Sequence, residues 1–368
     1  MVIHIFNPEH DIMLADGRST ATAPHAARAL RGDLGFLPAL WAHNGDVILV
    51  DDVGASIAAW RAVRRYTADV IFLSWFELSC IDFSASENIV IDPWGWDSAV
   101  VRSLLQTSPS LERFVPDKRQ LASIRSMSNR RFAQERILPE LLKRDERFVG
   151  QAYYVSDFDA LLDTMERYES CVVKAPWSSS GRGVRYFRST PDAAQRAWCR
   201  NVIKRQGGAT VEPLYDKVAD FAMEFAAQPD GTVDYRGLSL FLTLKGAYTS
   251  SIIASERDKQ RLLTRYIEPE LLATTQQAAT ECAALALKES GYVGPFGIDM
   301  MVVNDRATGR RRVHPCVEMN LRRTMGHVAL ALAGDATMPQ RLMTIRKEGP
   351  FRLHITTTGE NLLNTAAP

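Results

Sequence analysis

The sequence predicts an α/β protein whose C-terminal part has α+β organisation, and three observations support this. Four short apolar segments in residues 1–117 alternate with helical patterns, which is typical of a small parallel sheet. Residues 170–187 read as two strands around a glycine- and serine-rich loop, and residues 294–326 read as two longer strands joined by a turn. A chain of 368 residues is too long for one small core, so we expect two or three domains or subdomains.

Composition and charge limit the classes of function. The net charge of +1 gives no bulk electrostatic reason to bind nucleic acid or a membrane surface. No apolar stretch is long enough to span a bilayer, and the N-terminus has no basic region of the kind that opens a signal peptide. The five cysteines are scattered without a CxxC pair, which argues against a disulfide framework or a zinc site. We therefore expect a cytoplasmic protein.

The first part of the chain offers candidate ligand contacts in its loops. Its expected strands lie at residues 2–6, 46–50, 68–73 and 88–92, with a helical pattern at 55–66. Ligands of open α/β sheets collect at the carboxyl ends of the strands, so His10 and Asp11 are candidates for substrate contact. The alternative for both is a helix N-terminus with surface acids. Trp94 and Trp96, after the fourth strand, either line a pocket or pack in the core.

A charged amphipathic helical region is expected next, at residues 118–142, and it contains Arg130 and Arg131. A further helix is expected at residues 157–168. Ser156 precedes this helix and is a favoured N-cap residue, because its hydroxyl can accept from the free amides of the first turn.

The loop at residues 177–183 has the composition of an anion-binding hairpin. Lys174 ends the strand before it, and the small residues of the loop let backbone amides approach phosphate oxygens closely. Arg182 adds a second positive charge. The loop is neither a Walker A motif nor a dinucleotide-binding fingerprint. A flexible hairpin tip is the alternative to phosphate binding.

The rest of the sequence, from residue 210 onwards, predicts further strands and helices. Residues 210–215 lead into a strand at 220–225, a further strand is expected at 238–244, and a last strand at 351–357. The charged run at 256–261 is interpreted as a solvated face. Residues 269–289 predict a long helix ended by Ser290 and Gly291, and residues 328–332 begin another.

The hairpin at residues 294–326 carries the sharpest pattern. Strand side chains alternate between faces, so Glu318 and Asn320 project from one face, roughly 6.6 Å apart along the strand. Asp299, on the first strand, joins that face only if the connecting loop has an even number of residues. A two-residue turn at Thr308 and Gly309 would place Asp299 directly opposite Glu318.

A longer even loop through Asn304 and Asp305 is the rival to that turn, because threonine is poor in the other turn position. Either loop brings two carboxylates and one amide oxygen together. Hard oxygen ligands of this kind suit Mg²⁺, which takes one or two carboxylates and keeps waters or substrate phosphates. The alternative is an ordinary exposed sheet face with polar residues.

These motifs, in their order and spacing, resemble the ATP-grasp superfamily, specifically its carboxylate–amine ligase branch. The resemblance covers about residues 118–335. It implies an ATP-grasp fold preceded by a small parallel-sheet α/β domain at 1–117. A lid subdomain would then span 118–211, a C-terminal subdomain with the metal site 212–345, and an extension 346–368.

The resemblance also implies how ATP is bound. Lys174 would contact the phosphates, and the lid amides would cover them; these belong to Ser178, Ser179, Ser180 and Gly181. Glu212 and Leu214 would meet adenine, partly through backbone groups. Asp220 would take the position of the ribose-binding acid, where the family usually has glutamate.

Metal and substrate contacts follow from the same resemblance. Asp299, Glu318 and Asn320 would hold the metal, expected as two Mg²⁺ ions with Mn²⁺ as the alternative. Arg130 or Arg131 would stand where a lysine is commoner in the family. A family arginine is replaced here by Gly297; Arg322 or Arg323 would supply that charge, and one of them would bind the substrate carboxylate.

The implied activity is ATP-dependent joining of a carboxylate to an amine through an acyl phosphate. The alternatives are a nucleotide-binding protein of this fold without ligase activity and a small-molecule kinase. We expect small-molecule or peptide substrates and neither nucleic acid nor membrane as partners. The sequence does not identify the substrates or the oligomeric state, and a homodimer is one open arrangement.

Overall fold

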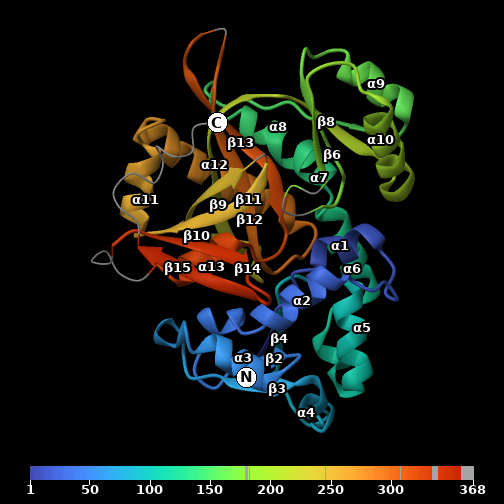
Figure 1. The fold of residues 1–368 in the computed structure, drawn as a ribbon, viewed down its shortest axis with the longest axis vertical. Coiled ribbons are helices and arrows are strands. Elements are labelled where there is room, and N and C mark those ends of the chain that lie inside the picture. Colours follow the sequence, from blue (N-terminus) through green and yellow to red (C-terminus); the bar gives the residue numbers. More distant parts are fainter. Residues whose placement is uncertain (179–180, 182, 245, 307, 334–338, 358–368) are drawn as a thin grey trace. The chain divides into compact units, whose positions relative to one another are not determined.

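The computed structural model describes all residues except 179–180, 182, 245, 307, 334–338 and 358–368 (Figure 1). The chain divides into two compact units. Within the described residues, the first unit comprises Met1–Arg125, Ser250–Ser255 and residues 322–357, and the second comprises Ser126–Thr249 and Glu256–Leu321. The four-part division expected from the sequence remains a prediction. Within the described residues, no helix combines the length and the apolar composition that crossing a membrane requires.

A small parallel sheet forms the centre of the first unit, as predicted. Its strand order is β3-β2-β1-β4, and every neighbouring pair is parallel. The strands are β1 (Val2–Ile5), β2 (Val47–Val50), β3 (Ile71–Ser74) and β4 (Val90–Pro93). The third and fourth strands begin later than predicted.

Helices accompany this sheet in the first unit. They are α1 (His10–Asp16), α2 (His25–Leu34), α3 (Val53–Trp60), α4 (Trp75–Ser79) and α5 (Ser98–Thr107). The helix predicted at 55–66 is wrong in its extent, because α3 ends at Trp60 and a separate 3₁₀ turn follows at Arg64–Tyr66. One core packs Ile3, Ile5 and Leu104 between the sheet and α5.

An antiparallel pair completes the first unit. β14 (Arg341–Lys347) pairs with β15 (Phe351–Thr357), the predicted last strand, and with the end of β11 (Ala247–Ile253). The helix expected to begin at 328 is α13 (Met325–Ala331), which starts earlier because the Thr324 hydroxyl accepts from the amides of its first turn. These elements share an apolar core with Phe6 and Trp94.

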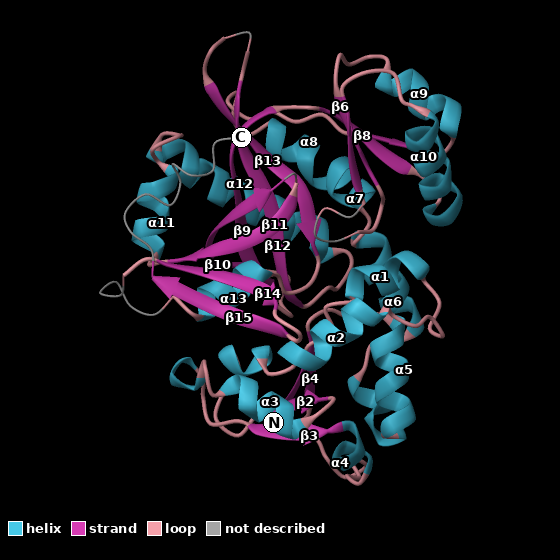
Figure 2. Ribbon diagram, viewed as in Figure 1, coloured by secondary structure: helices cyan, strands magenta, loops and turns pink. Residues whose placement is uncertain are grey.

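The second unit begins with an antiparallel sheet of order β5-β8-β6-β7. Its strands are β5 (Tyr153–Val155), β6 (Cys171–Lys174), β7 (Val184–Phe187) and β8 (Ala209–Pro213). Helices α9 (Phe158–Met165) and α10 (Ala193–Gln206) lie beside each other against this sheet (Figure 2). The predicted cap Ser156 is wrong: the Asp157 carboxylate accepts from the amides of Asp159 and Ala160.

Four longer antiparallel strands follow, in the order β13-β12-β9-β10. They are β9 (Asp216–Ala227), β10 (Val233–Leu244), β12 (Gly294–Asn304) and β13 (Arg311–Asn320). The predicted long helix is α12 (Pro269–Lys288), followed by Gly291 with a positive φ of 65°. The charged run is helix α11 (Glu256–Leu263) and is not wholly solvated, since Lys259 is buried and pairs with Glu256.

The helical region predicted at 118–142 is interrupted. It consists of α6 (Lys118–Met127), α7 (Arg130–Phe132), a π-helical turn at Ala133–Ile137 and α8 (Leu138–Leu142). The break has a local cause, because the Asn129 side chain accepts from the Arg131 amide and starts a new helix there. This new start places Arg130 in the first turn of α7, where it is 4% exposed.

Candidate functional site

The hairpin β12–β13 has the predicted register at its functional end. Asp299 lies directly opposite Glu318, and Asn320 lies opposite Gly297. The two-residue turn is wrong, because pairing stops at Asn304 and Arg311 and leaves the longer, even loop. In that loop the Asp305 amide donates to the Arg310 carbonyl and the Gly309 amide donates to the Asp305 carbonyl, and Gly309 has a positive φ of 67°.

A bulge in β13 reconciles the longer loop with this register. Asp299 and Met301 are two positions apart in β12, whereas their partners Glu318 and His314 are four positions apart in β13. Pro315 lies in the extra stretch, and proline cannot donate the ladder hydrogen bond that regular pairing would need there. Since the surplus is two residues, side-chain alternation keeps its phase.

Glu318 is tied to the loop after β6 by a buried arginine. Arg130 donates to Glu318 Oε1 at 2.7 Å and to the Ser178 hydroxyl at 2.8 Å. It also donates to the Ala175 carbonyl. Arg131 takes no part in this network: it is half exposed and pairs with Glu135 on the surface. Of the two arginines left open by the sequence, Arg130 is therefore the one at the site.

A second buried ion pair joins the neighbouring strands β6 and β8. Lys174 Nζ donates to Glu212 Oε2 at 2.6 Å, and their side chains are 9% and 4% exposed. His314 is also enclosed, and its burial together with the Lys174 charge lowers its pKa to about 3. The imidazole is therefore neutral at physiological pH. Neither of its ring nitrogens has a hydrogen-bond partner among the described residues.

The charged side chains of the hairpin and of strands β6 and β8 lie close enough to Cys316 to act on its pKa, so they share one region of the second unit. Burial raises the pKa of Cys316, and the charges of Asp299, Glu212, Lys174 and Glu318 also act on it. These residues come from four different strands.

Tyr186, on strand β7, belongs to the same region. Burial raises the pKa of Tyr186, with further contributions from the Asp220 and Glu212 carboxylates. Asp220 itself accepts from Lys217 and from the Thr243 hydroxyl. The acid predicted to bind ribose thus lies near Tyr186 of β7, and Lys217 and Thr243 donate to its carboxylate.

The loop between β6 and β7 packs closely where the structure describes it. Gly181 has a positive φ of 73°, and a Cβ there would lie 2.4 Å from the Gly246 carbonyl oxygen. A Cβ at Gly183 would lie 2.4 Å from Ser178. Both glycines are therefore required by space. Ser179, Ser180 and Arg182, which the sequence assigned to phosphate binding, lie outside the described residues.

The connector after β8 differs in one detail from the expectation. The Leu214 amide donates to the Ser170 carbonyl at 3.0 Å, so this backbone donor is already used. Glu212 is buried in the pair with Lys174. An adenine ring meeting this connector would therefore need a different backbone group from the Leu214 N–H.

The donor set at the hairpin suits a hard divalent cation. Asp299, Glu318 and Asn320 are each partly exposed and share one face. No group of three or more His, Cys, Asp or Glu with metal-binding geometry occurs in the described part of the chain. Two carboxylates and an amide leave ligand positions for water and phosphate oxygens, as Mg²⁺ prefers.

Arg322 and Arg323 belong to the first unit, and both guanidinium groups are paired there. Arg322 binds Asp11 at 2.7 Å, and Arg323 binds Asp92 at 2.6 Å. Burial alone would raise the pKa of Asp92, but Arg323 and His4 outweigh it and hold that pKa below its usual value.

The loop residues proposed for substrate contact have mainly structural positions. His10 is 1% exposed and bonds to Asp97 through Nδ1 at 3.3 Å. Trp94 packs edge-on against Phe6, with ring centroids 5.0 Å apart. Trp96 packs on the core between the parallel sheet and α5. The packing alternative for the tryptophans is thus the one observed.

Sequence reasoning missed His314 and Cys316 as neighbours of the site. Both share the alternation of Glu318 along β13, which was the available signal. It also missed Asn7, Glu9 and Arg31, whose positions depend on contacts between distant segments.

The two sheets and the hairpin site define the class of fold: this chain has an ATP-grasp fold, preceded in sequence by a small parallel-sheet α/β domain. Biotin carboxylase from Campylobacter jejuni, in a complex with a β,γ-ATP ligand, is similar with a TM-score of 0.51, 13% identity and coverage of 94% of this chain and 75% of that chain. The predicted fold class is confirmed.

Two further structures are similar. The biotin carboxylase domain of 2-oxoglutarate carboxylase from Hydrogenobacter thermophilus, with MgADP, ADP and bicarbonate, has a TM-score of 0.51, 14% identity and coverage of 94% and 74%. A protein from Archaeoglobus fulgidus assigned to the ATP-grasp superfamily has a TM-score of 0.46, 13% identity and coverage of 98% and 100%. No protein-family model and no curated protein sequence matches this chain.

Proposed function

We propose that this chain is an ATP-dependent ligase that joins a carboxylate to an amine through an acyl phosphate. One observation carries the proposal: Lys174, Glu212, Asp299, Glu318 and Arg130 lie together in the second unit, around the lid loop and the β12–β13 hairpin. Cations and hard oxygen donors in one region are what the transfer of a phosphoryl group requires. The biotin carboxylase structures of the same fold contain adenine nucleotides, which supports a nucleotide site.

Each residue of the candidate site has a proposed role in binding metal or nucleotide. Asp299, Glu318 and Asn320 would hold two Mg²⁺ ions, with Mn²⁺ as the alternative. Bound metal supplies neutralising charge to the phosphates. Lys174 and Arg130 add fixed positive charge. The nucleotide is further held by the lid segment at residues 178–181, by the connector around Glu212 and Leu214, and by Asp220.

The chemistry needs no protein nucleophile. A substrate carboxylate oxygen bonds to the γ-phosphorus while the bond from that phosphorus to the β–γ bridging oxygen breaks, and ADP leaves. The amine nitrogen then bonds to the acyl carbon, phosphate leaves, and the amine loses a proton. The lid loop excludes water, which would otherwise hydrolyse the acyl phosphate. Arg322 and Arg323 remain our proposed contacts to the substrate carboxylate.

The deciding experiment combines trapping with one variant. Hydroxylamine added during ATP consumption should convert the acyl phosphate to a hydroxamate, with amino acids and short peptides screened as substrates. Glu318→Gln keeps an acceptor for Arg130 but loses a metal-binding charge, so it should lower ADP release at least 100-fold. Glu166→Gln, at an exposed site, is the matched control and should be unchanged. Wild-type ATP consumption by Glu318→Gln would overturn the metal assignment, and ADP release without hydroxamate would favour a kinase.

A nucleotide-binding protein without ligase activity is the second candidate, and one observation favours it. Arg130 already occupies Oε1 of Glu318, so a metal at Glu318 competes with a buried guanidinium. This candidate predicts Mg-ATP binding by calorimetry and no ADP release with any carboxylate.

A further inference from the structure

The first unit contains a cavity of about 210 Å³ that the proposed chemistry does not use. It lies at the carboxyl ends of the parallel strands, where Asn7 follows β1 and Asp97 follows β4. Glu9, directly before α1, adds a carboxylate to the lining, and helices α2 and α5 supply the arginines Arg28, Arg31 and Arg102. One water needs only ~10–15 Å³ of such space, so the cavity has room for a small organic molecule. Ligands of open α/β sheets bind at this edge.

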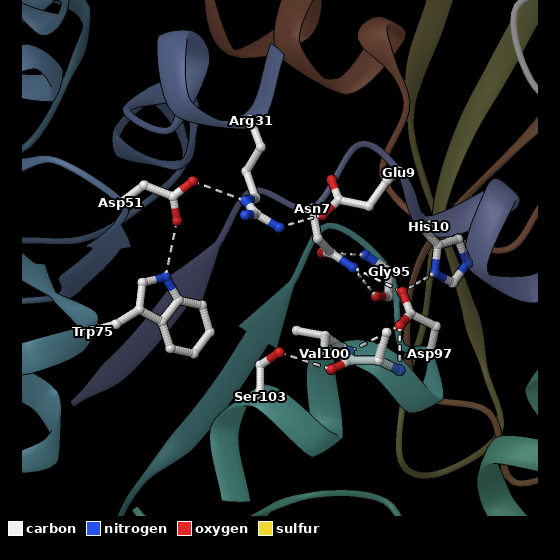
Figure 3. A network of polar contacts seen from close by, with 11 residues as sticks. Asn7, Glu9, His10, Arg31, Asp51, Trp75, Gly95, Asp97, Val100 and Ser103 are labelled. Atoms are coloured by element: carbon white, nitrogen blue, oxygen red, sulfur yellow. Dashed lines mark hydrogen bonds and ion pairs between the residues drawn. The ribbon is translucent and has the colours of Figure 1, made fainter. Parts of the chain in front are cut away.

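A satisfied hydrogen-bond network holds the frame of the cavity (Figure 3). Asn7 Nδ2 donates to the Gly95 carbonyl at 2.8 Å and to Asp97 Oδ2 at 3.1 Å. Asp97 Oδ1 accepts from the amides of Ala99 and Val100 at the start of α5, and His10 bonds to Oδ2. Because the Asp97 oxygens are fully used, this network fixes the two loops and leaves ligand binding to other groups.

One carboxylate oxygen of Glu9 is free to accept a hydrogen bond from a ligand. Arg31 donates to Glu9 Oε1 at 2.5 Å and to Asp51 at 3.0 Å, and Trp75 donates to the second Asp51 oxygen at 3.1 Å (Figure 3). Glu9 is 5% exposed, and its Oε2 has no hydrogen-bond partner among the described residues. Burial also raises the pKa of Glu9. An unpartnered buried oxygen destabilises the folded chain, and a donor group on a ligand would remove that cost.

Two arginine side chains of the lining also lack partners among the residues that the structure describes. The side chains of Arg28 and Arg102 form no ion pair or hydrogen bond with any residue that the structure describes. Nε of Arg102 is a buried donor without a partner. A guanidinium pairs with a carboxylate through two parallel hydrogen bonds, which makes this side of the cavity suited to a carboxylate.

We propose that this cavity binds a small free amino acid by both of its charged ends. The ligand carboxylate pairs with Arg28 and Arg102, and its ammonium group donates to Glu9. A molecule with only one of these groups satisfies only half of the unpartnered atoms. Binding at this cavity needs no nucleotide and does not depend on the proposed function.

Binding to the full chain without nucleotide tests this proposal. The twenty proteinogenic amino acids are screened by saturation-transfer NMR, and the strongest binder is titrated by calorimetry. Its N-acetyl and carboxamide derivatives should each bind at least tenfold more weakly. Inorganic phosphate and acetate should also bind at least tenfold more weakly than the amino acid. No binding by any amino acid at millimolar concentration, or equal binding of acetate, would overturn the proposal.

Variants connect the binding to the named groups. Glu9→Gln and Arg102→Met should each raise the Kd at least tenfold. Glu112→Gln and Arg119→Met, at exposed positions of the same unit, should leave it unchanged. Arg102→Lys keeps the positive charge but loses the guanidinium, so its Kd should lie between those of the wild type and Arg102→Met. Thermal unfolding of each variant shows whether it is folded. Unchanged affinity in a folded Glu9→Gln or Arg102→Met would contradict the assignment. Because ATP is absent throughout, failure of the ligase proposal would not alter these results.

Discussion

The two units of the chain treat buried charge differently. In the second unit, Lys174 and Glu212 form an ion pair in which both side chains are almost wholly enclosed. In the first unit, Glu9 is similarly enclosed but its partner Arg31 is 31% exposed and is shared with Asp51. The first pair is closed on itself, whereas the second leaves one carboxylate oxygen unpartnered among the described residues.

This difference separates two uses of charge. A closed pair in a low-dielectric interior is costly to break, because each partner depends on the other to offset its desolvation. An open pair beside a cavity keeps capacity for a third group. We therefore expect changes in the second unit to act mainly on stability and phosphoryl chemistry, and changes in the first to act mainly on ligand affinity.

The largest effect should come from breaking the closed pair. Lys174→Met leaves the Glu212 carboxylate buried and uncompensated, so the free energy of unfolding should fall by about 3–5 kcal/mol. Urea denaturation measures it. Lys143→Met removes an exposed pair with Glu140 and should cost about 1 kcal/mol or less. The double variant Lys174→Met/Glu212→Met should recover most of the loss. If Lys174→Met lowered the free energy of unfolding no more than Lys143→Met does, the Lys174–Glu212 pair would not be closed.

The next effect is a dependence on pH from His314. Its pKa falls from 6.5 to about 3 on folding, so the unfolded chain binds the extra proton between these values. Stability should therefore decline as pH falls through this window, by about 1.4 kcal/mol per pH unit. His314→Leu should flatten this part of the profile. Parallel profiles for the wild type and the variant would mean that folding does not lower the pKa of His314.

Glu9 should give a smaller effect of the opposite sign. Its pKa is raised by burial above 4.5, and Arg31 offsets part of that rise. The folded state therefore holds the proton more tightly, and stability contributed by Glu9 declines as pH increases through the raised pKa. The difference in unfolding free energy between wild type and Glu9→Gln, measured from pH 4 to 8, should change in that direction. A rise with pH would contradict the burial of Glu9.

The smallest effect compares two helix caps. Asp157 only caps α9, so Asp157→Ala should cost about 1 kcal/mol, and Ser156→Ala should leave stability within about 0.5 kcal/mol of the wild type. Asp97 caps α5 and also accepts from Asn7 and His10, so Asp97→Ala should cost more than Asp157→Ala. Thermal denaturation decides it; equal losses would mean that the Asn7 and His10 contacts contribute nothing.

Local patterns predicted much of the fold, since strand alternation and helix period depend on neighbouring residues. The parallel sheet, helix α12 and the facing of Asp299 and Glu318 were predicted in this way. Turn geometry was not: the pairing ends before Thr308, and the compensating bulge lies at Pro315. A register that depends on two separate irregularities cannot be obtained from alternation alone.

Contacts between distant segments were beyond such patterns. The pairing of Arg130 with Glu318 joins residues 188 positions apart, and the cavity frame joins Asn7 to Asp97 across 90 positions. Neither separation leaves a local signal. Strands β11 and β14 were also missed, although β11 contains Tyr248, Thr249, Ile252 and Ile253, residue types that favour strands.

The surplus of two residues in β13 limits how the length of this hairpin can change. Loss of a single residue between His314 and Glu318 would turn Glu318 and Asn320 towards the apolar side, whereas loss of a pair would only straighten the strand. Insertions and deletions that keep Glu318 and Asn320 on the face of Asp299 should therefore come in even numbers, and odd ones should occur only in proteins that do not need the proposed metal site.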